Sequence, residues 1–180
     1  GRKPVRFNRR MIALPENQEL ANKGHQQVRL MEYLNQMPVS QLIADFTEAD
    51  DIIAHVINNP RYEGWKKTII SSDKDFFQLC RPDVQIYRPI QKKIVTHETI
   101  IEEFKIHPNN FALARAMAGD ASDNLPGVKG AGLKTIAKRF SFLGREDEYE
   151  VADIVRECLM VPKKLKIHEN VKSSEELIKS

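Results

Sequence analysis

The segment from residue 120 to residue 137 constrains the fold of this chain more than any other. It begins with two carboxylates, Asp120 and Asp123, and continues through a turn punctuated by Gly127, Gly130 and Gly132. Glycines let the backbone turn tightly and leave N–H groups open to an anion at the start of the following helix. Carboxylates next to such a turn indicate a divalent cation and a phosphate held close together. This combination is typical of phosphodiester chemistry on nucleic acid.

The composition is that of an ordinary globular protein and excludes several classes. The chain has 180 residues, of which 41% are hydrophobic and 29% charged, and its net charge is +3. That length predicts a domain with a core of its own. The two cysteines are far apart, which favours a reducing compartment such as the cytoplasm over a disulfide framework. Because no apolar run approaches the roughly 18 residues of a membrane span, we expect no membrane partner.

Short apolar runs alternate with amphipathic segments along the chain. Strands are predicted at 40–46, 67–72, 84–87 and 93–96, and helices at 19–37, 47–57, 97–104, 108–118, from 133 on, and at about 148–159. Thr47 is the expected N-cap of its helix, with Asp50 completing a capping box. The alternation predicts an α/β fold with a mainly parallel sheet and covering helices.

Acidic residues gather at three points of this pattern. The groups are Glu48, Asp50 and Asp51; Asp73 and Asp75; and Asp120 and Asp123. The second group follows a predicted strand, and ligands of open α/β sheets bind at the carboxyl edge of the strands. Such a crowd of carboxylates is costly unless cations neutralise it, and oxygen ligands select Mg²⁺, Mn²⁺ or Ca²⁺ over zinc. Two such ions, about 4 Å apart, would suit phosphodiester hydrolysis.

Each acidic group also has a simpler interpretation. The first group suits the first turn of a helix, where carboxylates interact favourably with the macrodipole. The second group could consist of plain turn residues, and the third could cap a turn beside Asn124 and Pro126. All three simpler interpretations would have to hold together at one predicted sheet edge. We therefore favour a single site that the three groups share.

Basic residues surround the glycine turn and occur again at the N-terminus. The turn resembles the hairpin of helix–hairpin–helix motifs, which grip the DNA backbone without reading base sequence. DNA contacts are therefore assigned to Gly127, Lys129, Gly130, Gly132, Lys134, Thr135 and Lys138, with Arg139 adding charge. Backbone carbonyls of the turn are also candidates for holding a K⁺ ion. An ordinary glycine loop is the alternative. Residues 1–18, with Arg2 and Lys3, are either a solvated arm or a further nucleic-acid contact.

Three strings of residues resemble the 5′ nucleases, a family that includes flap endonucleases, bacteriophage 5′-3′ exonucleases and the 5′-nuclease domain of bacterial DNA polymerase I. They are Glu-Ala-Asp-Asp-Ile-Ile at 48–53, Ser-Asp-Lys-Asp-Phe-Phe-Gln-Leu at 72–79, and Gly-Asp-Ala-Ser-Asp-Asn-Leu-Pro-Gly-Val-Lys-Gly-Ala-Gly at 119–132. The resemblance runs in order from about residue 40 to residue 143. It implies a resolvase-like (PIN-like) core with a helix-three-turn-helix DNA-binding module.

The same resemblance implies roles for the acidic residues. All of them would bind two Mg²⁺ ions, with Mn²⁺ as a substitute, and Asp50, Asp73 and Asp75 would be the catalytic set. Glu48, Asp50 and Asp73 would lie nearest the first ion, and Asp75, Asp120 and Asp123 nearest the second, while Asp51 is a further metal ligand. The implied substrate is branched or 5′-ended DNA, including 5′ flaps, nicks and RNA–DNA primer junctions.

By this resemblance the chain divides into three parts. Residues 1–95 would be a partial catalytic core with the remnant of a basic arch, 96–145 the helix-three-turn-helix module, and 146–180 a helical tail that packs on the core. Family members carry a first strand, two further aspartates and most of the arch ahead of the point where this chain begins. The chain is therefore expected to be the C-terminal two-thirds of a nuclease, with a missing segment or a companion chain supplying the rest.

Two functions of other classes remain open at this point. One is a truncated branched-DNA-binding module that keeps the hairpin and has lost catalysis. The other is a PIN-type ribonuclease, which would share the acids but would not need a duplex-gripping glycine turn.

Overall fold

The computed structural model describes residues 16–121, 124–160, 166–175 and 178. The chain divides into two compact units, residues 1–52 and residues 53–180, and each is described by itself. Two predicted features, the basic N-terminal arm with Arg2 and Lys3 and the side chain of Asp123, lie outside the described residues. Across the described ranges, no helix combines the length and the apolar character that a bilayer crossing requires.

The first unit contains α1 (Glu16–Leu34), which confirms the helix predicted at 19–37. The strand predicted at 40–46 is wrong, because the chain there forms no regular element and Ile43 is 81% exposed. An apolar run becomes a strand only when a neighbouring strand completes its hydrogen bonds. Among the described residues no strand pairs with this segment.

α2 (Ala49–Ile57) begins in the first unit and ends in the second. The predicted capping box is not formed within the described residues. The helix begins two residues after Thr47, and the Thr47 hydroxyl donates a 3.2 Å hydrogen bond to the Asp45 carbonyl. Asp50 and Asp51 lie in the first turn of α2, where their charges favour the helix macrodipole. The helix therefore starts with electrostatic help and without a side-chain cap.

The second unit is built on a mixed sheet with the strand order β1-β2-β3. The strands are β1 (Lys67–Ile70), β2 (Val84–Arg88) and β3 (Lys93–Val95), close to the predicted ranges. β1 and β2 are parallel, with Ile69 opposite Ile86, whereas β2 and β3 are antiparallel, with Ile86 opposite Val95. These three paired side chains are buried and place the core on one face of the sheet.

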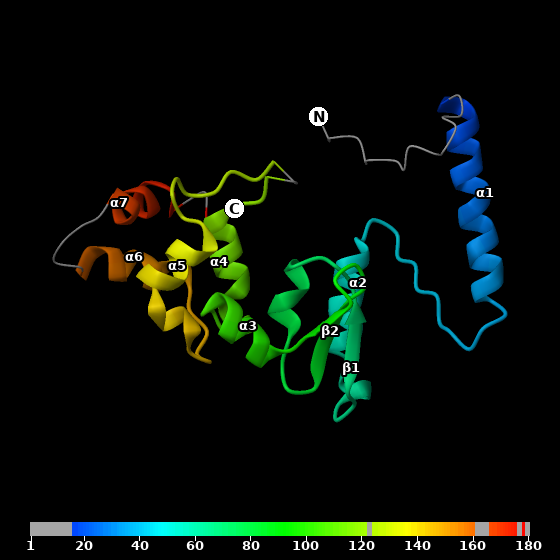
Figure 1. Ribbon diagram of the computed structural model, residues 1–180, viewed down its shortest axis with the longest axis horizontal. Helices are drawn as coiled ribbons and strands as arrows, with labels where there is room; N and C mark the ends of the chain where they lie inside the picture. The colour runs from blue at the N-terminus through cyan, green and yellow to red at the C-terminus, as the bar shows by residue number, and fades with distance from the viewer. Residues whose placement is uncertain (1–15, 122–123, 161–165, 176–177, 179–180) are drawn as a thin grey trace. The chain divides into compact units, whose positions relative to one another are not determined.

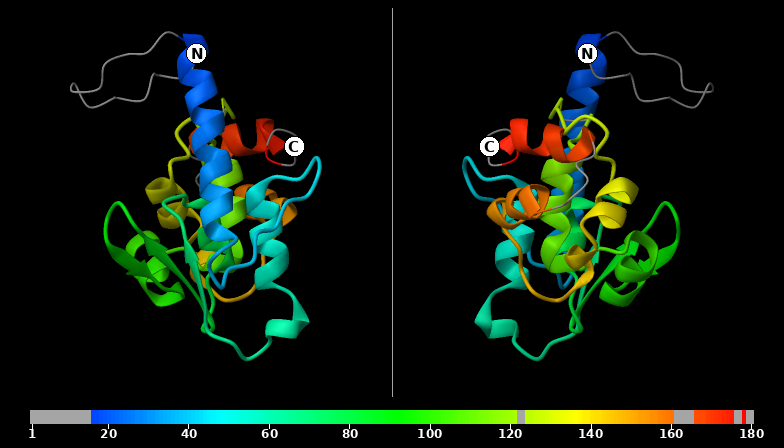
Figure 2. Two further views of the ribbon diagram at one scale, coloured as in Figure 1. Left: turned by 90° about the vertical axis from the view of Figure 1, so that its right-hand side faces the viewer. Right: turned by 90° about the vertical axis from the view of Figure 1, so that its left-hand side faces the viewer.

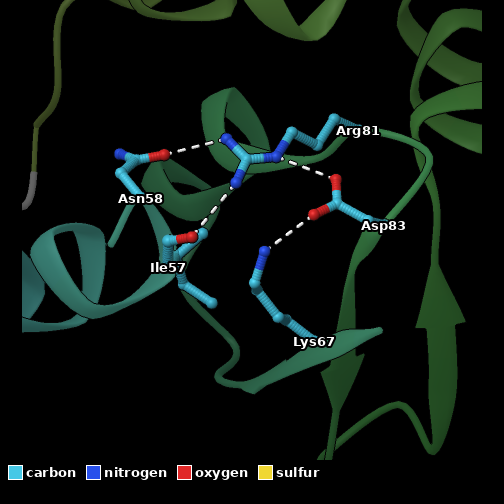
Figure 3. A network of polar contacts seen from close by, with 5 residues as sticks. All are labelled: Ile57, Asn58, Lys67, Arg81 and Asp83. Carbon is cyan, nitrogen blue, oxygen red and sulfur yellow. Dashed lines mark hydrogen bonds and ion pairs between the residues drawn. The ribbon is translucent and has the colours of Figure 1, made fainter. Parts of the chain in front are cut away.

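A polar network fastens the end of α2 to the amino ends of β1 and β2 (Figure 3). Lys67 Nζ and Arg81 Nε lie 2.8 Å and 2.9 Å from the two carboxylate oxygens of Asp83. Arg81 also donates to the Ile57 carbonyl at 3.0 Å and to Asn58 Oδ1 at 2.8 Å, which satisfies a carbonyl at the end of the helix. The hydrogen bond from Lys67 lowers the pKa of Asp83 below its ordinary value.

The remaining helices follow the sheet along the chain. They are α3 (His97–Phe104), α4 (Phe111–Ala118), α5 (Leu133–Arg139), α6 (Val151–Met160) and α7 (Lys166–Ser173). α3 has the range predicted for it, and the Thr96 side chain starts it in a capping box with Thr99. In Figure 1, α4 lies between the strands and the group formed by α5, α6 and α7.

Three aromatic rings join the sheet to the helices. Phe77, Phe104 and Phe111 have ring centroids 5.3 to 5.8 Å apart in tilted or edge-to-face arrangements. Phe77 lies in the turn that follows β1, Phe104 in α3 and Phe111 in α4. The cluster therefore fixes the position of α4 relative to the carboxyl end of β1.

A buried amide orders the chain between α5 and α6. Asn110 is fully buried, and its Nδ2 donates to the carbonyls of Leu143, Arg145 and Asp147 at 3.2, 3.1 and 2.9 Å. Its Oδ1 accepts a hydrogen bond from the Tyr149 N–H at 3.0 Å. One side chain thus satisfies four backbone groups and attaches this charged connection to the start of α4.

Candidate active site and nucleic-acid interface

The carboxyl end of β1 carries the second predicted acidic group. Asp73 follows the strand, and Asp75 begins a 3₁₀ helix (Asp75–Leu79). Asp73 Oδ1 accepts a 2.9 Å hydrogen bond from the Asp75 N–H, while Ser71 Oγ accepts one from the Asp73 N–H at 3.1 Å. The simpler interpretation of Asp73 as a turn residue therefore holds for one of its carboxylate oxygens. Its position at the edge of the sheet also agrees with the metal-site prediction.

Arg115 brings members of two predicted acidic groups together. Its Nε lies 2.9 Å from Asp75 Oδ1, and its Nη2 contacts Asp120 Oδ2. The Arg115 side chain is only 22% exposed, so the two ion pairs are partly shielded from water. Burial disfavours the charge of Arg115, but its hydrogen bonds to Asp120 and Asp75 outweigh this and raise its pKa. One guanidinium therefore holds two carboxylates from separate elements at a single point.

The sequence reasoning missed Arg115, although a signal was present. It is the only charged residue in α4, whose sequence is otherwise apolar. A charge on a helix that packs into a core is costly unless an opposite charge neutralises it. An arginine in such a helix, five residues before Asp120, was therefore a sign that carboxylates lie close to α4.

Asp120 begins a tight loop after α4. Its N–H donates to the Leu125 carbonyl at 3.0 Å, and its carbonyl accepts from the Leu125 N–H at 2.8 Å. The backbone of the loop is thereby closed on itself, while the Asp120 side chain leaves it toward Arg115. Asp123 belongs to the stretch between these two residues and lies outside the described part of the chain.

The seven predicted metal ligands are divided between the two units of the chain. Glu48, Asp50 and Asp51 are exposed residues at the start of α2 and belong to the first unit. Among the described residues, no group of three or more His, Cys, Asp or Glu side chains lies close enough together to hold a metal ion. Asp75 and Asp120 are brought together, and the metal-binding roles of all seven acids stay predictions.

The glycines near the third acidic group serve two different purposes. A Cβ atom on Gly127 would stand 2.0 Å from the Ala118 carbonyl oxygen, and one on Gly119 would stand 2.2 Å from the Gly127 nitrogen. Two backbone segments therefore touch where only glycine fits. At Gly130 and Gly132, by contrast, no atom lies within 4 Å of such a Cβ. These two glycines leave open space, as a surface that receives a phosphate backbone requires.

The predicted DNA-contacting lysines lie around this open space in the sequence and are all exposed. They are Lys129 in the hairpin and Lys134 and Lys138 on α5. Within the described ranges none of them forms a salt bridge with a carboxylate. Thr135 is half-buried, and its N–H donates to the Gly132 carbonyl at 2.8 Å. The positive charge of this region is therefore available to an external anion.

Comparison with known families identifies the fold. Residues 16–105, half of the chain, match the sequence model of the 5′-3′ exonuclease N-terminal resolvase-like domain. The chain belongs to this family. Its resolvase-like fold with a mixed sheet confirms the predicted fold class, while the helix-three-turn-helix module and the three-part division stay predictions.

Relatives of this 5′-3′ exonuclease family member include polymerases and free-standing nucleases. A thermostable DNA polymerase I of Thermus aquaticus is 34% identical over 109 residues, which are 61% of this chain and 13% of the polymerase. A 5′-3′ exonuclease of Buchnera aphidicola is 34% identical over 126 residues, which are 68% of this chain and 44% of that protein. The chain thus matches less than half the length of either relative.

Solved structures of bacteriophage T5 proteins have the same fold. A T5 5′-exonuclease with bound zinc ions aligns with 92% of this chain and 59% of its own length, at a TM-score of 0.69 and 24% identity. A T5 flap endonuclease in a complex with DNA and metal ions aligns with 92% of this chain and 59% of its own length, at a TM-score of 0.68 and 23% identity. The alignments extend the family likeness of the fold beyond residue 105 to the helices that follow.

Proposed function

We propose that this protein is a divalent-metal-dependent, structure-specific 5′ nuclease that hydrolyses phosphodiesters at 5′ ends, flaps or RNA primers during DNA replication and repair. The observation that carries the proposal is the convergence of Asp75 and Asp120 on Arg115 at the carboxyl end of β1. Family membership and the nucleases among the relatives support the same reaction class.

The carboxylates fit a hard divalent cation such as Mg²⁺ or Mn²⁺. Asp75 and Asp120 offer oxygen atoms only, and their meeting on one guanidinium demonstrates that a positive charge at this point is favourable. When bound there, the ions would activate water and stabilise the leaving oxygen. Asp73, next to the same turn, is the third ligand that this chain offers at the end of β1. Arg115 keeps the carboxylates of Asp75 and Asp120 near each other in the absence of metal.

The hairpin between α4 and α5 would hold the substrate through its backbone phosphates. Open space at Gly130 and Gly132 and the exposed charges of Lys129 and Lys134 support this assignment. Backbone contacts of this kind are independent of base sequence, as recognition of a flap or a nick by shape requires. A K⁺ ion held by carbonyls of the turn is part of the proposal.

A second candidate is a branched-DNA-binding module without catalysis. It is supported by the open space at Gly130 and Gly132 and the exposed lysines of the hairpin, since binding through these groups requires none of the acids. The two candidates predict the same DNA binding in EDTA and differ in cleavage when metal is added.

The test is cleavage of a 5′-labelled flap duplex by the chain with Mg²⁺ and with EDTA. We expect cutting near the junction with Mg²⁺, and a loss of at least about 100-fold in the Asp120→Asn variant with binding in EDTA retained. Asp147→Asn, the same change at an exposed carboxylate, is the matched control and should cut normally. Binding without cutting would favour the second candidate. Absence of both binding and cutting would contradict both candidates.

A further inference from the structure

The last described helix, α7, contacts the glycine hairpin directly. Asn170 Nδ2 donates a 2.8 Å hydrogen bond to the Lys129 carbonyl. The ring of His168 lies 6.1 Å from that of Phe140, which ends α5, in an edge-to-face arrangement. The buried side chains of this helix are Ile167, His168 and Val171. Figure 2 shows α7, in red, at the same end of the second unit as the loop between α4 and α5. α7 is therefore anchored in the core and reaches the hairpin with one amide.

The hydrogen bond acts on the central peptide of a tight turn. The Ala131 N–H donates to the Val128 carbonyl at 2.9 Å, which closes a turn of four residues, 128–131. Gly130, at its third position, has a φ of 84°, the value of a type II turn. Types I and II differ by a rotation of roughly half a turn of the peptide that joins the second and third residues. In this turn that peptide contains the Lys129 carbonyl and the Gly130 N–H.

The direction of the Gly130 N–H follows from this contact. In a trans peptide the C=O and the N–H point in opposite directions, and the described residues contain no cis peptide. Because the Lys129 carbonyl faces Asn170, the Gly130 N–H faces away from α7. Gly130 is exposed, and no hydrogen bond between described residues uses its N–H. A rotated peptide would instead turn the carbonyl outward, where it would repel a phosphate.

We propose that Asn170 is a positioning residue for DNA binding, which selects the type II turn and so presents the Gly130 N–H to a DNA phosphate. α7 then belongs to the phosphate-binding module and is more than a tail that packs on the core. This inference rests on the proposed DNA-binding function of the hairpin and deepens it.

The first test replaces the amide of Asn170 by the apolar side chain of similar shape, Asn170→Leu, and measures duplex binding in EDTA over a range of salt concentrations. One lost hydrogen bond should weaken binding about three- to tenfold. The salt dependence should stay unchanged, because no charge is removed, whereas Lys129→Ala should lower the slope by about one. Asn170→Gln, which keeps the amide donor, should recover part of the affinity. Ser173→Ala is the control, since the hydrogen bond from Ser173 Oγ goes to the Asn170 carbonyl within α7.

A second readout is independent of DNA. In a type II turn the Gly130 amide proton lies against the Lys129 Hα, so NMR should record a strong NOE between them in the wild-type chain and a weak one in Asn170→Leu. Equal DNA affinity in the two proteins, or an unchanged NOE, would overturn the positioning role. Absence of DNA binding by the wild-type chain would instead refute the proposed function of the hairpin, and the NOE would still report whether Asn170 sets the turn.

Discussion

The acidic site and the glycine hairpin meet in the sequence at Asp120, yet different forces hold them. The acids are held by charge, through two ion pairs to Arg115, and the Asp75 side chain is still 45% exposed. The base of the hairpin is held by backbone contact, because Gly119 and Gly127 leave no room for a Cβ atom. Side chains on flexible stems can rearrange when a cation arrives, whereas touching backbones cannot. This contrast suits the two proposed functions. The acidic site has to admit a metal ion, whereas the hairpin has to keep the shape that binds a phosphate backbone.

The largest expected effect comes from a methyl group at the base of the hairpin. In Gly127→Ala the new Cβ would lie 2.0 Å from the Ala118 carbonyl oxygen, and backbone on both sides prevents relief. We expect a loss of about 3 kcal/mol or more in the free energy of unfolding, together with weakened DNA binding. Urea denaturation and duplex binding in EDTA would measure the two effects.

Gly132→Ala is the matched control for this substitution. Nothing lies within 4 Å of the added Cβ, and the φ of −66° and ψ of 154° at Gly132 suit any residue. Its stability should change by less than about 1 kcal/mol. Equal destabilisation by the two alanines would contradict the distinction between packed and open glycines.

An intermediate effect should follow loss of the shared cation. In Arg115→Met, Asp75 and Asp120 lose the guanidinium that both contact and stay partly shielded from water, which should cost about 1–2 kcal/mol of unfolding free energy in EDTA. Mg²⁺ should raise the melting temperature more in this variant than in the wild type, because the ion replaces the missing positive charge. Arg156→Met, at an exposed ion pair with Asp153, is the control and should change little. Identical Mg²⁺ shifts in wild type and variant would count against a metal site at these two acids.

The smallest effect concerns the network at the opposite end of the strands. Lys67 lowers the pKa of Asp83, so the ionised carboxylate stabilises the fold above the ordinary pKa of 3.8. That stabilisation is lost as the pH falls through the lowered value. Asp83→Asn should therefore cost about 1 kcal/mol near neutral pH, a value limited by solvent screening, and less near about pH 2. Unfolding free energies at the two pH values test this, and a cost independent of pH would show that packing is responsible.

Local signals predicted most of the fold. The strand at 84–87 and the helix at 97–104 were found because short apolar runs and amphipathic segments are properties of a few neighbouring residues. The strand expected at 40–46 failed because pairing depends on another part of the chain, which local composition does not contain.

The candidate site shows the same difference between features set by local sequence and features set by contacts with distant residues. Its acids were recognisable because carboxylates at strand ends and before a glycine turn carry their chemistry in the local sequence. Arg115 was missed because its partner Asp75 stands forty positions away and only packing brings the two together. Asn170 was missed for the same reason, since it lies 41 positions from the hairpin carbonyl that it binds.

The aromatic cluster acts as a spacer for the acidic site. Phe77 stands two residues after Asp75, and Phe111 stands one helical turn before Arg115, with the two ring centroids 5.3 Å apart. The tilted, closely packed rings therefore set the distance that the guanidinium must bridge. A larger or smaller side chain at Phe77 or Phe111, deep in the core and out of reach of any substrate, would therefore alter the spacing of the charges at the surface.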